Sequence, residues 1–325
     1  MARIAVTDGM APEAVSVLEN AGHKVVLEHI SKPDLLSGKL KDYDAIIVRS
    51  ATKLTADVIA ASNGLKVIGR AGVGVDNIDL ESAGSCGVMV VNAPRASTQS
   101  VVELTIAHLL ASIRYVARAD RGLRDGLWEK KQLKGTELSG KKLGLIGYGR
   151  IAQGVADVAR AMGMEIHTYD PYLPPKIAKS QGTYLHKKVD TLFQSCTHIS
   201  VHCNLTDETY HLVNMDRMKM MPGKAGGINC GNHIVNCARG GIIDEEALLM
   251  ALDDGTISSA ALDVFEVEPI SEGNPLIAHE NFHGTPHIGA ATLEAQRRVG
   301  IDIANAVISA LDGNKPDTLV NGKFL

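Results

Sequence analysis

Short apolar runs alternate along the chain with segments in which apolar residues recur every three or four positions. Runs such as 45–48 and 143–146 are uninterrupted, as in strands of a parallel sheet that is covered on both faces. Segments such as 12–21 and 293–311 have the helical period, and each ends close to a glycine. This alternation predicts an α/β fold with doubly wound parallel sheets.

The same pattern predicts elements along most of the chain. Further strands are expected at 4–6, 24–27, 67–68, 88–91, 165–169, 198–202, 233–237 and 260–264. Further helices are expected at 57–61, 80–83, 101–125, 151–162, 189–193, 216–221 and 244–252. Asp244 is the expected N-cap of the last of these. A chain of 325 residues is long enough to bury the cores of two such domains.

The segment 141–172 carries the most specific chemical signal. It is a strand–helix–strand unit that reads G-x-G-x-x-A from Gly147, with Asp170 following the second strand. Gly147 permits a tight turn, and Gly149 lets a pyrophosphate approach the helix N-terminus, where N–H groups and the helix dipole favour anions. Ala152 still allows close helix–strand packing. Asp170 can accept hydrogen bonds from ribose hydroxyls and would repel a 2′-phosphate, which favours NAD over NADP.

Composition narrows the class of protein. The chain is 45% apolar and 22% charged, as in soluble globular proteins, and its net charge of −4 argues against a general nucleic-acid binder. Neither a signal peptide nor a membrane span is expected, because Met1 leads directly into a strand and no apolar stretch is long enough. Five scattered cysteines are typical of a reducing cytoplasm.

A metal site is considered in the segment 196–203, where histidine and cysteine are frequent. Alternate residues of a strand point to opposite faces, so Cys196, His198 and His202 share one face while Cys203 lies on the other. We therefore expect no metal site in this chain.

Two loops in the first half have unusual chemistry. The strand at 45–48 runs into Arg49 and Ser50, where cations and hydroxyls suit a phosphate or a carboxylate; a solvated strand exit is the alternative. The loop 69–77 is rich in glycine and can present successive N–H groups to an anion, or it is only a tight turn.

Three charged residues follow predicted strands in the second half. Arg239 can bind a carboxylate bidentately, His287 can transfer a proton near neutral pH, and Glu268 can orient the ring and favour its protonated form. With NAD, this set suits hydride exchange at an alcohol carbon beside a carboxylate. Taken singly, each residue has an ordinary alternative: Arg239 as a surface residue before a helix, Glu268 as a loop acid and His287 as a turn histidine.

Two segments between these regions have structural interpretations. The predicted helix at 101–125 would link two domains, with Glu103 and His108 packed between them. The polar, glycine-punctuated segment 128–140 is interpreted as an excursion that makes a dimer contact.

Six motifs together make the chain similar to the D-isomer-specific 2-hydroxyacid dehydrogenases over nearly its whole length. They are 48–53 (VRSATK), 70–77 (RAGVGVDN), 147–151 (GYGRI), 236–241 (NCARGG), 262–269 (LDVFEVEP) and 286–290 (PHIGA). The resemblance implies two Rossmann-like or flavodoxin-like domains with a cleft between them. It implies a discontinuous substrate domain (1–93 plus 291–325), a continuous NAD domain (94–290), and a homodimer at least.

The resemblance also implies roles for individual residues. For catalysis it implies Arg239, Glu268 and His287. For the cofactor it implies Gly147, Gly149, Arg150, Ile151, Asp170, Cys203, Cys237, Ala238, Asp263 and Ala290. For the substrate it implies Arg49, Ser50, Val73, Gly74 and Arg239.

The motifs favour the family branch that oxidises 3-phospho-D-glycerate to 3-phosphohydroxypyruvate, the entry to serine synthesis. The alternatives are another D-2-hydroxy acid (glyoxylate, hydroxypyruvate or lactate), or an NADH-sensing corepressor-like binding protein.

Two departures from the family pattern stand out. The segment 224–232 is roughly seven residues longer and is expected to form a surface loop. No regulatory amino-acid-binding domain follows the last helix, so feedback inhibition by serine is not expected.

Overall fold

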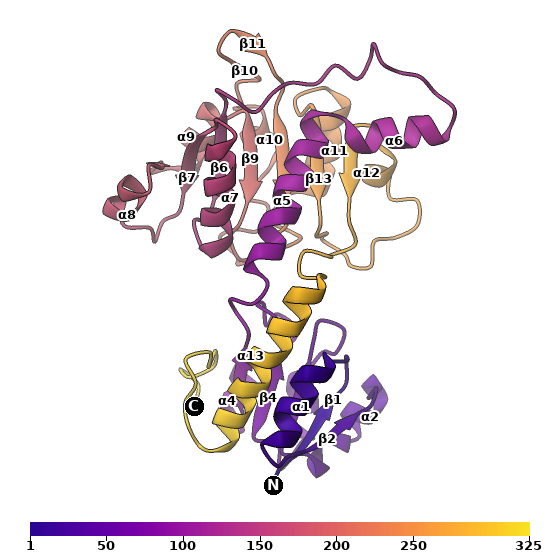
Figure 1. The fold of residues 1–325 in the computed structure, drawn as a ribbon, viewed down its shortest axis with the longest axis vertical. Coiled ribbons are helices and arrows are strands. Elements are labelled where there is room, and N and C mark those ends of the chain that lie inside the picture. The colour runs from indigo at the N-terminus through magenta and orange to yellow at the C-terminus, as the bar shows by residue number, and fades with distance from the viewer. The chain divides into compact units, whose positions relative to one another are not determined.

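The computed structural model describes residues 1–325, which form two compact units (Figure 1). The discontinuous unit combines Met1–Ser97 with Ala290–Leu325, and the continuous unit is Thr98–Gly289. The expected boundaries were after residues 93 and 290, so the structure gives four residues more to the discontinuous unit at the first boundary and Ala290 at the second.

The discontinuous unit is built on a five-stranded parallel sheet in the order β2-β1-β3-β4-β5. Its strands are β1 (Arg3–Val6), β2 (Lys24–Leu27), β3 (Ala45–Val48), β4 (Val67–Arg70) and β5 (Met89–Asn92). Its helices are α1 (Pro12–Asn20), α2 (Lys32–Leu36), η1 (Lys39–Asp42), α3 (Ala56–Ala60), α4 (Leu80–Ser85) and α13 (Leu293–Leu311).

Strand β3 explains why this sheet is covered on both sides. All four of its residues are buried, and alternate ones enter different cores: Ile47 packs with residues of α13, whereas Ile46 packs in the core that contains Leu40. Helix α13 lies directly on the sheet, since a Cβ added at Gly69 would be only 2.7 Å from Cγ2 of Val307. The far end of the chain is thus part of the N-terminal domain's core.

The continuous unit contains a seven-stranded parallel sheet in the order β14-β13-β12-β9-β6-β7-β8. Its strands are β6 (Lys142–Ile146), β7 (Glu165–Tyr169), β8 (Tyr184–Leu185), β9 (His198–Val201), β12 (His233–Asn236), β13 (Ser259–Leu262) and β14 (Phe282–Gly284). Its helices are α5 (Thr98–Ile113), α6 (Val116–Arg124), α7 (Arg150–Ala161), α8 (Pro175–Ser180), α9 (Val189–Ser195), α10 (Met215–Met218), α11 (Glu245–Asp253) and α12 (Pro275–Ala278).

The predicted strand–helix–strand unit at 141–172 is confirmed as β6–α7–β7. Helix α7 ends where Gly163 adopts φ +85°, a conformation that favours glycine, and β6 pairs with both β7 and β9 at the centre of the sheet. Asp244 also caps α11 as predicted, since its side chain accepts a hydrogen bond from the Ala247 N–H at 2.9 Å.

Other sequence expectations were wrong. The single helix expected at 101–125 is two helices, α5 and α6, which meet at Tyr115 (φ +53°) with a bend of 66°. Strands β8 and β14 were not predicted; both are short edge strands. By contrast, the expected surface loop in the lengthened segment is confirmed. It is a small exposed hairpin, β10 (Lys224–Ala225) and β11 (Ile228–Asn229), and β12 beyond it keeps regular register with β9.

No single helix is long and apolar enough to cross a membrane, and α5 with α6 meets that length and composition test only as a bent pair. Within the continuous unit, α5 packs against α7, β12 and β13 and contributes buried residues such as Leu109 to the core.

The C-terminal segment is attached to β5 by backbone hydrogen bonds and by one buried side chain, and the side chain gives a stability prediction. Asn321 is fully buried; its Oδ1 accepts from the Val90 N–H (2.9 Å) and its Nδ2 donates to the Val88 carbonyl (2.8 Å). Asn321→Ala leaves two buried backbone groups unpaired, so we expect a loss of about 2–5 kcal/mol in unfolding free energy. Urea denaturation measures this loss. The exposed Asn314→Ala is the matched control, and equal stability of the two variants would contradict the assignment.

Candidate functional site

The turn after β6 has the geometry that a dinucleotide requires. Gly147 has φ +85°, and a Cβ there would lie 3.0 Å from both the Cys203 nitrogen and the His202 oxygen, so no larger residue fits. A Cβ at Gly149 would meet nothing within 4 Å, and Gly149 caps α7 without a side-chain hydrogen bond. The start of α7 is therefore open to an anionic ligand.

Asp170 lies at the end of β7 beside this turn. Its Oδ2 accepts a hydrogen bond from the Tyr148 N–H and its Oδ1 from the Tyr172 N–H, each at 2.9 Å. Each oxygen keeps a second lone pair for a ribose hydroxyl. The open glycine turn and the fixed acid together fit the adenosine diphosphate half of NAD.

Two of the predicted cofactor residues that follow other strands are cysteines. Burial raises the pKa of the Cys203 thiol to about 11 and that of the Cys237 thiol to about 12. Both are therefore neutral, apolar wall residues near neutral pH and not nucleophiles.

Asp263, another predicted cofactor residue, has a structural task that was not expected. It is buried, and its carboxylate accepts three hydrogen bonds: from the Thr285 hydroxyl (2.6 Å), the Ile288 N–H (2.8 Å) and the Gly289 N–H (2.8 Å). Its carbonyl oxygen also accepts from the backbone N–H of His287 at 2.9 Å. Asp263 thus fixes the whole loop 285–289 to the end of β13.

His287 and Glu268 lie in direct contact. Nδ1 of His287 is 2.7 Å from Oε2 of Glu268, whose Oε1 accepts from the Phe265 N–H at 3.0 Å. A carboxylate can only accept, so the neutral ring carries its proton on Nδ1 and leaves Nε2 as the acceptor. The His287 side chain is 45% exposed, which leaves Nε2 able to meet a ligand.

Arg239 occupies a rigid turn after β12, the strand next to β13. Asn236 ties this turn by accepting from the Ala238 N–H (2.9 Å) and donating to the Arg239 carbonyl (2.8 Å). A Cβ at Gly240 would be 1.8 Å from the Phe265 oxygen, so the arginine turn presses against the segment that leads to Glu268. The three predicted catalytic residues therefore follow three neighbouring strands: Arg239 follows β12, Glu268 follows β13 and His287 follows β14.

In the discontinuous unit, the predicted substrate loop after β3 is held by two residues, Asp8 and Asn77, whose role there was not predicted from the sequence. Asp8 accepts from the Arg49 N–H (2.7 Å) and from the Thr52 hydroxyl (2.7 Å), and Asn77 donates to the carbonyls of both residues. Ser50 is exposed in this loop. Asp8 follows β1, which neighbours β3 in the sheet. Its position directly after a strand is the feature of the sequence from which a role at this edge could have been predicted.

The glycine loop after β4 contains the other predicted substrate residues. Gly72 has φ +155°, and a Cβ there would fall 1.5 Å from Nη1 of Arg70. Asn92 donates to the Val73 carbonyl at 2.7 Å, and Val73 is 38% exposed, next to Gly74. The loop is thus fixed by its neighbours and not merely a flexible turn.

Comparison with known proteins agrees with this geometry. Residues 106–289 match the family model described as the NAD-binding domain of D-isomer specific 2-hydroxyacid dehydrogenases. The chain belongs to this family. It is 46% identical to the D-3-phosphoglycerate dehydrogenase of Methanocaldococcus jannaschii over 99% of its own length, and it spans 60% of that relative. It is 45% identical to the hydroxypyruvate reductase of Thermotoga maritima, over 95% of this chain and 98% of the reductase.

Solved structures give the same fold. The TT0316 protein of Thermus thermophilus superposes with a TM-score of 0.88 at 33% identity, covering 98% of this chain and 99% of that one. As in the family model, residues 106–289 of this chain are an NAD-binding domain, and the α/β fold with parallel sheets predicted from the sequence is confirmed.

One buried histidine, His108, supports the loop 285–289, which contains His287. His108, on α5, lies 3.0 Å from the Thr285 hydroxyl through its Nε2, and its ring is 5.1 Å from that of His283. Burial lowers the pKa of His108, and the charge of Asp263 partly offsets this. A neutral His108 thus packs beneath the loop.

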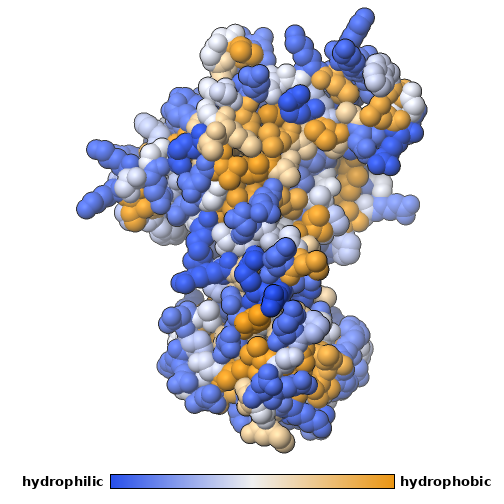
Figure 2. Space-filling model, in the orientation of Figure 1, coloured by the Kyte–Doolittle hydropathy of each residue, from blue (hydrophilic) through white to orange (hydrophobic).

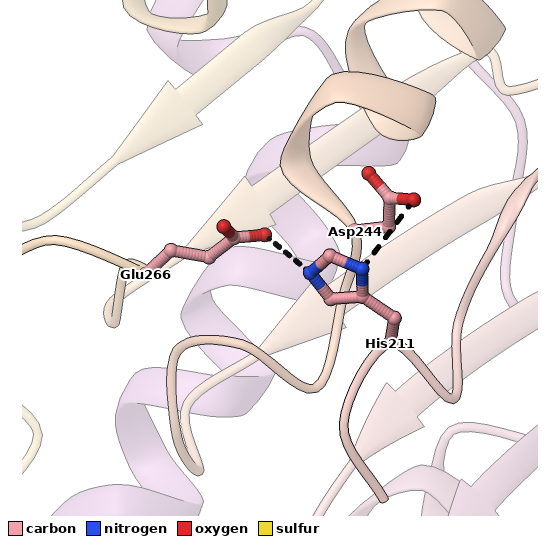
Figure 3. Close-up of side chains that lie close together, drawn as sticks. All are labelled: His211, Asp244 and Glu266. Carbon is pink, nitrogen blue, oxygen red and sulfur yellow. Dashed lines mark hydrogen bonds and ion pairs between the residues drawn. The ribbon is translucent and has the colours of Figure 1, made fainter.

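One group of side chains has spacing compatible with a metal ion, and it was not predicted. Ligand atoms of His211, Asp244 and Glu266 lie within 4.8 Å of one another. Figure 3 shows the two carboxylates at different nitrogens of the ring, Glu266 at 3.0 Å and Asp244 at 3.6 Å. The histidine- and cysteine-rich segment 196–203 forms no such group.

Asp170 gives a prediction about cofactor choice. Asp170→Ala removes the acceptor for the ribose hydroxyls and the charge that repels a 2′-phosphate. We expect NADH to bind about tenfold more weakly and the preference for NADH over NADPH to shrink, as measured by fluorescence titration. The exposed Asp157→Ala on α7 is the control. An unchanged preference in Asp170→Ala would contradict this role.

Proposed function

We propose that this chain is an NAD-dependent oxidoreductase that oxidises 3-phospho-D-glycerate to 3-phosphohydroxypyruvate, the first step of serine synthesis. The observation that carries the proposal is the 2.7 Å pair of His287 and Glu268 in an NAD-binding domain. Arg239, whose guanidinium can bind a carboxylate, follows β12, and β12 pairs with β13, the strand that precedes Glu268.

The proposed catalytic roles follow from the hydrogen bonding. His287 takes the substrate hydroxyl proton on Nε2, because Glu268 engages Nδ1 and keeps the ring oriented. Arg239 binds the substrate carboxylate and holds the reacting carbon in place. When bound, NAD supplies the hydride acceptor. The NAD site is proposed to include the residues Gly147, Gly149, Asp170 and Asp263 described above. It is also proposed to be lined by Arg150, Ile151, Cys203, Cys237, Ala238 and Ala290.

The phosphorylated substrate is supported by the loop after β3. A guanidinium beside a hydroxyl, as at Arg49 and Ser50, suits a phosphate, and Asp8 fixes the backbone of that loop. Val73 and Gly74 are proposed to donate backbone N–H groups to the substrate carboxylate. The name of the Methanocaldococcus relative is consistent with this substrate.

A second candidate keeps the same chemistry and changes the acid. The Thermotoga relative is a hydroxypyruvate reductase and matches over nearly its whole length, which favours an unphosphorylated substrate such as hydroxypyruvate or glyoxylate. In that case Arg49 has no phosphate to bind.

We also propose that the protein forms at least a homodimer and works in the cytoplasm. Helix α6 and the segment after it expose four large apolar side chains: Val116, Leu123, Leu127 and Trp128, the last 80% exposed. Figure 2 shows apolar residues among the polar ones in the region of α5 and α6. All five cysteines are free, which suits a reducing compartment.

Arg49 distinguishes the two substrates. The proposal predicts NADH production from 3-phospho-D-glycerate well above that from glycerate, lactate or glycolate. Arg49→Ala should raise KM for the phosphorylated acid about tenfold or more, because a charge-assisted pair is lost, and should leave KM for an unphosphorylated acid unchanged. Equal rates with and without the phosphate, and equal effects of the variant, would support the second candidate instead.

His287 tests the chemistry itself. His287→Ala removes the proton carrier, so we expect turnover to fall by about 10²–10⁴-fold while NADH still binds. The exposed histidine His29, in the other unit, gives the control variant His29→Ala. Near-normal turnover of His287→Ala would rule out the proposed mechanism.

A further inference from the structure

The loop that presents Glu268 is tied to the start of α11 by a second acid, Glu266. The Glu266 N–H donates to Oε1 of Glu245 at 2.6 Å, and the Glu245 N–H donates to Oε1 of Glu266 at 3.1 Å. This reciprocal pair fixes the loop two residues before Glu268.

Glu266 has one further partner, His211, whose backbone is itself fixed. Nε2 of His211 lies 3.0 Å from Oε1 of Glu266, and Nδ1 lies 3.6 Å from Oδ2 of Asp244 (Figure 3). The His211 N–H donates to the Gly241 carbonyl at 2.8 Å, and the Tyr210 ring stacks on the imidazole at 3.9 Å. His211 therefore connects Glu266 with the segment 241–244, which leads into α11.

The acidic surroundings explain why Glu266 needs a hydrogen-bond donor. Four carboxylates gather in this region: Asp244, Glu245, Glu266 and Glu268. Burial, and then the negative charges of Glu266 and Glu268, raise the pKa of Glu245, while a hydrogen bond from the Glu266 backbone lowers it. A hydrogen bond from Nε2–H of His211 to Oε1 of Glu266 holds this carboxylate in place among its acidic neighbours.

We propose that His211 is a positioning residue for the reaction: it holds Glu266, and through it the loop that orients Glu268 toward His287. The inference rests on the proposed function of His287 and Glu268. His211 contacts none of the proposed catalytic side chains, so its effect passes through Glu266.

The kinetic test compares two substitutions at His211. His211 has φ +49°, so Ala and Gln carry a similar backbone cost, and only Gln keeps a donor near the Nε2 position. His211→Ala should lower kcat about tenfold to hundredfold, with both KM values within about twofold of wild type, and His211→Gln should recover most of kcat. A Gln variant no better than the Ala variant would overturn the proposal.

Two controls separate positioning from general damage. His279→Ala removes another histidine of the same unit that pairs with an acid (Asp253, 3.7 Å), and it should leave kcat unchanged. In a double-mutant cycle, His211→Ala should add little to the loss already caused by Glu266→Ala, because both act through one contact. Fully additive losses would contradict a path through Glu266.

An activity-free readout keeps this inference distinct from the proposed function. Hydrogen exchange of the backbone amides at 265–268 should be faster in His211→Ala than in wild type or His279→Ala, because the loop loses a restraint. Unchanged exchange overturns the positioning role even if the enzyme is active. A wild-type protein that oxidises no 2-hydroxy acid, with or without a phosphate, overturns the proposed function instead.

Discussion

The arrangement of the proposed catalytic pair depends on one buried carboxylate, Asp263. A buried carboxylate needs hydrogen-bond donors to offset its lost hydration, and Asp263 obtains three, all from the loop 285–289. The segment that leads to Glu268 continues from Asp263 at the end of β13, and the loop with His287 is hydrogen-bonded to the same residue. Both are thus held at the end of one strand. This explains how two residues 19 positions apart meet at 2.7 Å.

Close backbone approach sets the rest of the site. At Gly147 the turn after β6 lies against the end of β9, and at Gly240 the arginine turn lies against Phe265. In both places a side chain would separate elements that must touch. These contacts fix the turns after β6 and β12 at the carboxyl edge of the sheet, where they can present groups to a ligand.

The sequence predicted those parts of the site that depend on local pattern. The order of strand, glycine turn, helix and acid from Gly147 to Asp170 is a short-range signal, and the charged residues after strands were found by the same reasoning. The sequence did not predict that Asp263, Asp8 and His211 anchor other loops through hydrogen bonds. Each depends on partners distant in sequence, and no local period marks a carboxylate as an anchor for another loop. The break at Tyr115 was missed because the apolar pattern continues across it, while the backbone turns there.

In the proposed mechanism, Glu268 fixes the tautomer of His287, with the proton on Nδ1 and Nε2 free to accept. ¹⁵N NMR of histidine-labelled protein reports this directly, with the His287→Gln variant supplying the assignment. We expect the neutral His287 ring to have a protonated Nδ1 and an unprotonated Nε2, and Glu268→Gln to abolish this preference. A ring protonated on Nε2 in the wild-type protein would contradict it.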